Sequence, residues 1–242
     1  MSTTEALPEV DLMDSLEPLA RRLGNGAGKR RGLFITFEGI DGAGKTTQLK
    51  MLAARLREQG KGVLETAEPG GTSVGLQIRR ILLDTSNPEL SAMAELLLLF
   101  ACRAQNVEEA ILPALDQGLI VLCDRFTDST VAYQGAGRGL AIDTVLAVDR
   151  IACQGLTPHL TLYLDIDVET ALERARARNR EDDAPATRIE EQTAEFHTRV
   201  RDAYLDLAAS RTERIRLVDG LGSREEVAER IWALVSRTLS TR

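Results

Sequence analysis

The residues with the clearest chemical signature lie in one glycine-rich segment. The pattern G-x-x-x-x-G-K-T spans residues 39–46, after an apolar stretch that predicts a strand and before a stretch that predicts a helix. Glycines let backbone amides approach phosphate oxygens, and a helix N-terminus adds donors. Lys45 would reach the β- and γ-phosphates, and the Thr46 hydroxyl would bind Mg²⁺. We therefore expect a nucleoside triphosphate site rather than a glycine-rich turn that binds nothing, formed by Gly39, Ile40, Asp41, Gly42, Ala43, Gly44, Lys45, Thr46 and Thr47.

A carboxylate and a guanidinium follow a later apolar run. Residues 119–123 are followed directly by Asp124 and Arg125. Open parallel sheets bind ligands at the carboxyl edge of their strands, where both side chains would lie. Asp124 could hold Mg²⁺ directly or through water, and the fork of donors on Arg125 suits the phosphate of a second substrate. The alternative is an ion pair on the protein surface.

The phosphate-binding pattern alone does not separate a kinase from a switch GTPase or a motor ATPase. A small GTPase would carry a guanine-reading N-K-x-D segment, which this sequence lacks, and motor ATPases usually need a longer chain or partners. Ser129 has no histidine near it in sequence, which disfavours a hydrolase. Transfer of a phosphoryl group to a small acceptor remains.

Four segments of the chain resemble segments of the thymidylate kinase family and occur in the same order as in that family. The most specific is residues 124–135, DRFTDSTVAYQG, which is similar to the signature DR[YHF]xxSxxAYQG; the others are residues 37–47, 68–72 and 103–105. The resemblance implies an enzyme that uses ATP and Mg²⁺ to phosphorylate dTMP to dTDP. It also implies a homodimer with a mobile lid.

The resemblance implies roles for residues on the acceptor side. Arg79 and Arg125 would bind the acceptor phosphate, because a planar guanidinium fixes orientation as well as charge. Arg103 would read thymine, Tyr133 would exclude a 2′-hydroxyl, and Asp41 would bind the 3′-hydroxyl. The implied substrate-binding residues are Asp41, Pro69, Arg79, Phe100, Arg103, Arg125, Ser129, Tyr133 and Gln134, the metal ligands are Thr46 and Asp124, and the catalytic residues are Lys45, Asp124, Arg125 and Arg178.

Other interpretations stay open for several of these residues. Arg79 and Arg103 could be solvated charges on helices, and Asp41 could brace the phosphate loop. Phe100 could stack on thymine. The family places that aromatic four residues before the arginine, where this chain has Leu99, so Phe100 could equally be a core residue. The chain also departs from the family at Ala67, Leu76 and Thr187, where Arg, Glu and Asp are common.

Arginines are concentrated late in the chain, at positions 174, 176, 178 and 180. Four arginines at a spacing of two cannot share one helix face, so we expect a mobile segment that closes over the triphosphate. A solvated basic loop is the alternative. Because Gly42 stands where some family members carry a basic residue, a lid arginine is expected at the transferring phosphate. Arg178 is the first choice, with Arg174 as a further ATP-binding residue.

These residues need a sheet that brings their segments together. Apolar runs predict strands at 33–38, 62–66, 119–123, 160–165 and 215–218, and longer segments predict helices at 45–59, 73–83, 91–116, 141–154, 168–178, 189–209 and 224–239. Alternation of strands and helices predicts βαβ units. We therefore expect an α/β fold over residues 32–242, namely a three-layer P-loop NTPase or nucleoside monophosphate kinase fold with a five-stranded parallel sheet.

Composition limits the compartment and the partners of this 242-residue chain. Its net charge of −7 and pI near 5.1 argue against a general affinity for nucleic acid. The three cysteines form no C-x-x-C pair, and no apolar run is long enough to span a membrane. We expect a soluble, cytoplasmic enzyme that binds neither nucleic acid nor membrane. Residues 1–31 are expected to form a flexible extension, in which Leu12, Leu16, Leu19 and Leu23 could form a short docked helix.

Two other functions are compatible with the sequence. The fold and the phosphate loop would also suit a kinase for a different nucleotide or for a nucleoside. A nucleotide-binding regulatory protein without catalysis would need the loop but not Asp124 and Arg125, and their presence disfavours it.

Overall fold

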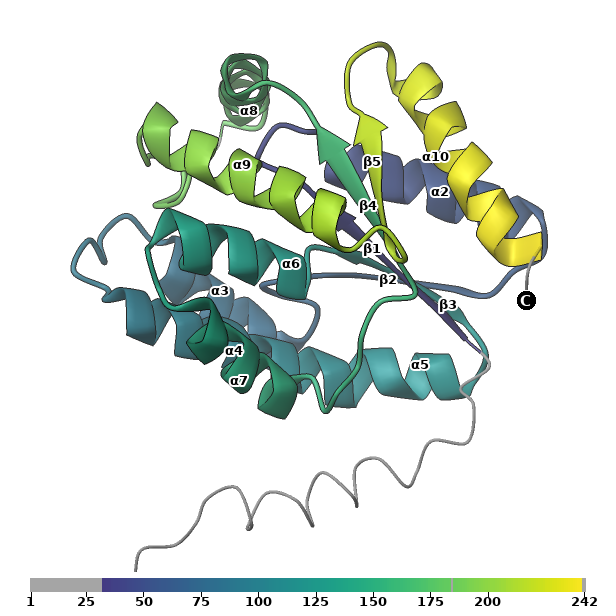
Figure 1. The fold of residues 1–242 in the computed structure, drawn as a ribbon, viewed down its shortest axis with the longest axis horizontal. Coiled ribbons are helices and arrows are strands. Elements are labelled where there is room, and N and C mark those ends of the chain that lie inside the picture. The colour runs from purple at the N-terminus through teal and green to yellow at the C-terminus, as the bar shows by residue number, and fades with distance from the viewer. Residues whose placement is uncertain (1–31, 184, 241–242) are drawn as a thin grey trace, which may run out of the picture. The chain divides into compact units, whose positions relative to one another are not determined.

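The computed structural model describes residues 32–183 and 185–240, so the predicted N-terminal extension and its candidate helix lie outside the described residues. Within these ranges, five parallel strands form one sheet in the order β2-β3-β1-β4-β5 (Figure 1). The strands are β1 (Leu33–Glu38), β2 (Val63–Ala67), β3 (Ile120–Asp124), β4 (Leu160–Asp165) and β5 (Ile215–Asp219). The prediction of an α/β fold with a five-stranded parallel sheet is confirmed.

The central strand β1 is buried over its whole length, as its apolar sequence indicates. Its alternate residues contribute to two cores. Ile35 and Phe37 belong to a cluster that contains the leucines of α2 (Lys45–Glu58), whereas Phe34 packs in a second cluster with Val121 and Phe126. A parallel sheet that helices cover on both faces needs strands of this kind.

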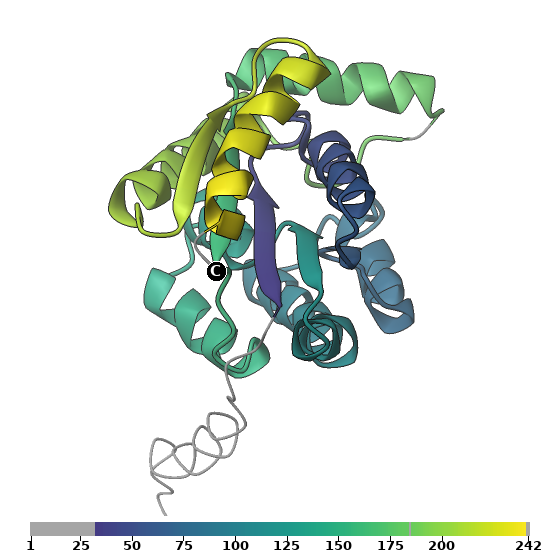
Figure 2. The ribbon, with the colours of Figure 1, turned by 90° about the vertical axis from the view of Figure 1, so that its right-hand side faces the viewer.

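Helices form the outer layers on both faces of the sheet (Figure 1 and Figure 2). On one side α2 packs against α10, and on the other α5 contacts β3 while α9 contacts β4 and β5. The helices are α2 (Lys45–Glu58), α3 (Ser73–Leu83), α4 (Ala92–Asn106), α5 (Leu112–Asp116), α6 (Thr127–Thr130), α7 (Ile142–Ala152), α8 (Val168–Glu181), α9 (Ala194–Ser210) and α10 (Arg224–Ser240), with π-helical segments η1 (Val107–Ile111) and η2 (Val131–Gly137).

Residues 127–137 form a helical segment, α6 and η2, that the sequence did not predict. Thr130, Val131, Gly135 and Gly137 all have low helix propensity. Most of the segment is buried, and η2 packs against α9 and α7. Tertiary packing therefore stabilises a helix that local propensity does not.

Two other boundaries differ from the prediction. The helix expected at 91–116 consists of α4, η1 and α5 in succession, so its middle has the wider π-helical turn. The helix expected from residue 189 begins only at Ala194, because the Thr193 side chain accepts a hydrogen bond from Phe196 N and caps the helix there.

No helix of the described residues has the length and apolar character needed to cross a bilayer. Cys102, Cys123 and Cys153 are buried and carry free thiols.

Candidate active site

The carboxyl ends of the strands open into a cavity of about 1160 Å³. Its walls come from the loops after β1, β2 and β5, from the end of β3, and from α3, α4 and α8. Cavities for one small ligand are typically about 300–1,000 Å³. This cavity is larger than that range, which is compatible with two ligands bound side by side.

The loop between β1 and α2 has the backbone shape that its glycines predict. Gly39, Gly42 and Gly44 have φ angles of 140°, 86° and 93°, in the region that favours glycine. A Cβ on Gly42 would lie 1.9 Å from the carbonyl oxygen of Ala171 in α8. A basic residue at this position is therefore excluded by direct packing of the loop on α8.

Lys45 begins α2, and its amine is enclosed by the loop. Nζ donates to the Ile40 carbonyl at 2.9 Å, and the residue is 6% exposed. Burial, followed by the positive charge of Arg125, lowers the pKa of Lys45 to about 8. An anion bound beside this amine would compensate both effects, so the position favours a phosphate.

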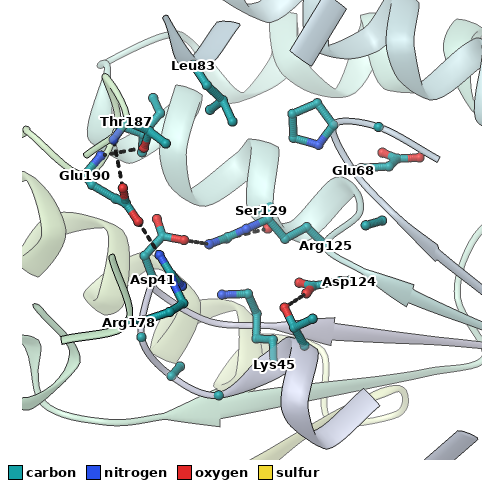
Figure 3. A pocket seen from close by; sticks show the side chains of 18 of the residues that line it. Asp41, Lys45, Glu68, Leu83, Asp124, Arg125, Ser129, Arg178, Thr187 and Glu190 are labelled. Atoms are coloured by element: carbon teal, nitrogen blue, oxygen red, sulfur yellow. Dashed lines mark hydrogen bonds and ion pairs between the residues drawn. The ribbon is translucent and has the colours of Figure 1, made fainter. Parts of the chain in front are cut away.

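Thr46 and Asp124 place two oxygen donors together. The register of β1 with β3 sets Asp124 beside Phe37, at the start of the phosphate loop. Thr46 Oγ1 donates to Asp124 Oδ2 at 2.5 Å (Figure 3). Mg²⁺ prefers hard oxygen ligands, usually one or two protein groups together with phosphates and waters. These two residues fit that ion, because their oxygens are close enough to share it.

Arg125 connects the phosphate loop to the opposite wall of the cavity. Its φ of 71° is a strained conformation for a residue other than glycine. Its guanidinium donates to the Gly39 carbonyl at 3.0 Å and to Asp41 Oδ1 at 2.7 Å. It also donates to Ser129 Oγ at 3.2 Å and lies 4.9 Å from the centre of the Tyr133 ring. The fork of donors is therefore fixed in orientation by the protein itself (Figure 3).

Asp41 is ionised in this setting. Burial raises the pKa of its carboxyl, but the charges of Arg125 and Lys45 outweigh burial, and the net pKa is lowered. Its second oxygen accepts from Tyr133 Oη at 3.4 Å. The carboxylate braces Arg125 and can still accept a hydrogen bond from a ligand hydroxyl.

Two further arginines line the same wall. Arg79 Nη1 donates to the Pro69 carbonyl at 2.7 Å and remains exposed. Arg103 is only 2% exposed: its Nε pairs with Glu68, and its Nη2 donates to Thr130 Oγ1 at 2.9 Å. Arg103 Nη1 makes no hydrogen bond among the described residues, but it lies 3.6 Å from Asp149 Oδ1, within ion-pair range. Arg103 is therefore a fixed, buried donor and not a solvated helix charge.

Phe100 lies behind this wall. It is 2% exposed, and the Arg103 guanidinium carbon is 4.9 Å from the centre of its ring. Leu99 lines the cavity instead. Consecutive residues of a helix point about 100° apart. An offset of one residue therefore places Leu99 on the cavity wall and Phe100 in the core. This geometry corrects the expectation that Phe100 faces the thymine base.

Glu38, at the end of β1, was not singled out from the sequence. Its carboxylate accepts from Phe126 N at 2.8 Å, Ser129 Oγ at 2.5 Å and Tyr204 Oη at 3.0 Å. Burial, followed by the charge of Asp128, raises the pKa of Glu38 to about 7. The residue fixes the start of the α6–η2 segment beside Arg125. An acidic residue at the end of an apolar strand was its one signal in the sequence.

The arginine-rich segment is helical, because the helix expected at 168–178 continues to Glu181 as α8. All four arginines lie in α8, where a spacing of two distributes them over different faces. Arg174 and Arg178, four residues apart, line the cavity, whereas Arg176 lies beside a second, smaller one. Arg174 Nη1 donates to the Gly220 carbonyl at 3.2 Å, and Arg178 Nη2 donates to Glu190 Oε1 at 2.5 Å.

The cavity wall includes most residues predicted for ATP, acceptor and metal. Gly39, Ile40 and Phe100 are absent from it, although the Gly39 and Ile40 carbonyls hold Arg125 and Lys45. The predicted residues on the wall are Asp41, Gly42, Ala43, Gly44, Lys45, Thr46, Thr47, Pro69, Arg79, Arg103, Asp124, Arg125, Ser129, Tyr133, Gln134, Arg174 and Arg178.

Comparisons with known proteins agree with this geometry. The family model for thymidylate kinase matches residues 37–231. A thymidylate kinase of Pelobacter propionicus is 50% identical over 212 residues, covering 87% of this chain and 95% of that protein. One from Geotalea daltonii is 53% identical over 191 residues, covering 78% of this chain and 89% of that protein. The crystal structure of thymidylate kinase from Ehrlichia chaffeensis aligns with a TM-score of 0.68 and 32% identity, over 85% of this chain and 98% of that one. The chain belongs to the thymidylate kinase family.

Proposed function

We propose that this cavity transfers the γ-phosphoryl group of ATP directly to the phosphate of dTMP. As a member of the thymidylate kinase family, with a relative 50% identical over most of its length, the chain phosphorylates dTMP to dTDP with ATP. The observation that carries the mechanism is that Arg125, oriented by Asp41, lines the same cavity as Lys45. No covalent enzyme intermediate is needed, because positioning and electrostatics suffice for in-line transfer.

ATP would bind on the side of the phosphate loop. The amides of residues 39–46 and the start of α2 would surround its phosphates, with Lys45 at the β- and γ-phosphates. Thr46 and Asp124 would hold Mg²⁺, which neutralises charge on the phosphate oxygens when bound. Arg174, beside the Gly220 carbonyl, would contact the donor from α8.

The acceptor dTMP would bind on the opposite wall. Arg79 and Arg125 would bind its phosphate, and Ser129 keeps Arg125 oriented through its hydroxyl. Tyr133 would lie against the sugar. The buried guanidinium of Arg103, which lines the cavity, would suit a base carbonyl.

Two groups would complete the reacting centre. Arg178 would leave Glu190 and donate to the transferring phosphoryl group, where negative charge develops. Asp41 would accept a hydrogen bond from the 3′-hydroxyl of the acceptor while it braces Arg125. The bracing role and the binding role use different oxygens of one carboxylate.

An acceptor panel tests this assignment. Turnover with ATP is measured on dTMP, dUMP, dCMP, AMP and thymidine, and we expect the highest kcat/KM for dTMP. A clear preference for another acceptor would refute the substrate assignment. ATP binding without turnover on any acceptor would instead identify a regulatory protein. Lys45→Met serves as the control that should lose turnover.

We further propose a homodimer. Exposed apolar side chains occur on three neighbouring helices, α3, α4 and α7, and adjacent exposed apolar residues are a mark of an interface. A second copy of the chain would cover this face by two-fold symmetry, the commonest arrangement in soluble oligomers. The residues concerned are Val74, Ile81, Met93, Leu97, Ile142 and Ile151.

The proposed compartment is the cytoplasm. Three buried free thiols support a reducing environment, because proteins of oxidising compartments more often use disulfides. Assaying dTMP kinase activity in soluble, envelope and secreted fractions of the producing cells would test this.

A further inference from the structure

One buried carboxylate on α4 contacts several segments that form the cavity. Glu95 is 1% exposed. Its Oε1 accepts from Gln134 Nε2 at 2.7 Å, and its Oε2 accepts from Arg188 Nη2 at 2.5 Å and from Arg138 Nη2 at 3.2 Å. Gln134 belongs to η2, Arg138 follows η2, and Arg188 lies in the segment after α8. Glu95 therefore joins the acceptor wall, through Gln134, to the segment that follows α8.

Arg188 fastens that segment to the end of α3. It is 7% exposed, its Nε donates to the Leu82 carbonyl at 3.0 Å, and its backbone N donates to the Leu83 carbonyl at 3.0 Å. Both acceptors are neutral, so Glu95 supplies the negative charge that this buried cation needs.

The residues on either side of Arg188 hold the lid arginine. Glu190 Oε2 accepts from the Thr187 backbone N at 2.8 Å, and Glu190 Oε1 accepts from Arg178 Nη2 at 2.5 Å (Figure 3). Because Thr187 and Glu190 flank Arg188 in one short turn, a shift of Arg188 moves the acceptor of the Arg178 hydrogen bond. A continuous path of contacts thus runs from Gln134 through Glu95 and Arg188 to Arg178.

Glu95 is ionised within this network. Burial raises the pKa of its carboxyl, but hydrogen bonds from Gln134 and Arg188 and the charge of Arg138 lower it by more. Loss of one member of a buried ion pair leaves the partner charge uncompensated, unlike loss of a solvated surface pair. A neutral side chain at position 95 would therefore release Arg188 more than it would disturb α4.

We propose that Glu95 is a positioning residue that couples dTMP binding at Gln134 to the placement of Arg178 at the triphosphate. The inference rests on the proposed roles of Gln134 and Arg178. Glu95 lines the cavity but is only 1% exposed, so the proposal assigns it no contact with either substrate. Each substrate then acts on one end of the same chain of hydrogen bonds. By thermodynamic reciprocity, dTMP raises the affinity for the triphosphate by the factor with which the triphosphate raises the affinity for dTMP.

Calorimetry on the full chain tests the coupling. The affinity for the Mg²⁺ complex of a non-hydrolysable ATP analogue is measured with and without saturating dTMP. In the unmodified enzyme we expect dTMP to tighten binding by about fivefold or more, as in typical allosteric coupling. Glu95→Gln keeps the shape but removes the charge, so we expect this ratio to fall below about twofold and kcat to fall by about tenfold or more.

Three variants separate positioning from general stability. Asp165 and Arg201 form an ion pair at 2.8 Å, and neither residue lines the cavity. Asp165→Asn removes this ion pair and should keep the wild-type ratio of affinities. Glu95→Asp retains the charge and should restore part of the ratio. The double variant Glu95→Gln/Arg188→Gln removes both charges and so avoids an unpaired buried cation, yet it should still lack coupling. The double variant keeps the test valid if Glu95→Gln does not fold.

Two results would overturn the inference. An unchanged ratio in folded Glu95 variants, accompanied only by a lower unfolding temperature, would show a purely structural role. The inference would also be overturned if dTMP left the affinity of the unmodified enzyme for the ATP analogue unchanged. Failure of the proposed function would look different, because the unmodified enzyme would then not phosphorylate dTMP at all.

Discussion

Burial gives Lys45 an acid–base behaviour that a surface lysine does not have. Its amine is enclosed by the phosphate loop, and its pKa is lowered to about 8 by burial and by Arg125. In the absence of nucleotide the amine therefore loses its charge as the pH rises through about 8. Between pH 8 and the unfolded value of 10.5 the unfolded chain binds more protons, so this group's contribution to the free energy of unfolding increases with pH.

We predict that ATP binding weakens above pH 8 because the lysine must regain a proton to bind phosphate. At pH 9 about one tenth of the amine is charged, which corresponds to roughly a tenfold loss of affinity. The measurement is the dissociation constant of Mg²⁺-ATP between pH 7 and 9.5. Lys45→Arg, which does not titrate in this range, should bind with a flat profile. Equal slopes for both proteins would contradict the assignment.

Residues differ in how far their roles can be predicted from sequence. Lys45 and Thr46 are predictable because phosphate binding requires them at a fixed spacing from the glycines. Glu38 and Glu95 were not predicted, because their partners Ser129 and Arg188 lie 91 and 93 residues away along the chain. Phe100 is an intermediate case. Its helix was predicted, but its side chain points into the core and the neighbouring Leu99 faces the cavity.

Among the elements, α8 determines how the lid arginines are presented. Its helical form sends Arg174 and Arg178 to the cavity and Arg176 toward the smaller cavity behind it. The helix expected at 168–178 already contained three of the four arginines, and its continuation to Glu181 adds Arg180. The α6–η2 segment was missed because its helix depends on packing and not on propensity.

The α8 geometry predicts different results for two arginines two residues apart. Arg178→Ala should lower kcat by about 10²-fold or more, because an arginine that stabilises the transferring phosphoryl group contributes roughly 10³- to 10⁵-fold in GTPases. Arg176→Ala, on the other face, is the matched control and should stay within about twofold. If Arg178→Ala also stays within about twofold in steady-state turnover, another residue supplies the charge.

The contact between the phosphate loop and α8 predicts an effect for Gly42→Ala. The new Cβ would lie 1.9 Å from the Ala171 carbonyl oxygen at a φ of 86°, so loop and helix must separate. We expect a loss of about 1–3 kcal/mol in the free energy of unfolding and a higher KM for ATP. Gly60→Ala, with a φ of 74° and no neighbouring atom within 4 Å, isolates the backbone strain. Equal losses in urea unfolding would contradict the packing argument.

At the scale of the whole molecule, the sequence predicted the α/β class and all five strands within a few residues, because alternating apolar runs and helical periods are local properties. The order of strands in the sheet depends on contacts between distant segments, so the sequence did not predict it. The same holds for which helix faces stay exposed. Leu97 on α4 and Leu217 on β5 are both about half exposed, at 51% and 50%, and nothing in their own sequence neighbourhood distinguishes them.

In the proposed dimer Leu97 would lie in the interface, whereas Leu217 would stay exposed. Leu97→Glu places a charge in the apolar face of α3, α4 and α7 and should halve the molar mass measured by light scattering at micromolar concentration. Leu217→Glu, with equal exposure on β5, should leave the mass unchanged. A monomeric unmodified enzyme, or equal behaviour of the two variants, would contradict the assignment of the interface.

Strand order also determines when the enzyme becomes competent during its synthesis. β1 pairs with β3 and β4, which the ribosome makes much later, and not with β2, the next strand in sequence. Residues 39–46 therefore leave the exit tunnel before the strands that hold them. Because a ligand stabilises only a chain that can form its site, we expect nucleotide to stabilise the nascent chain only after β4 has been made, although the phosphate loop is made first.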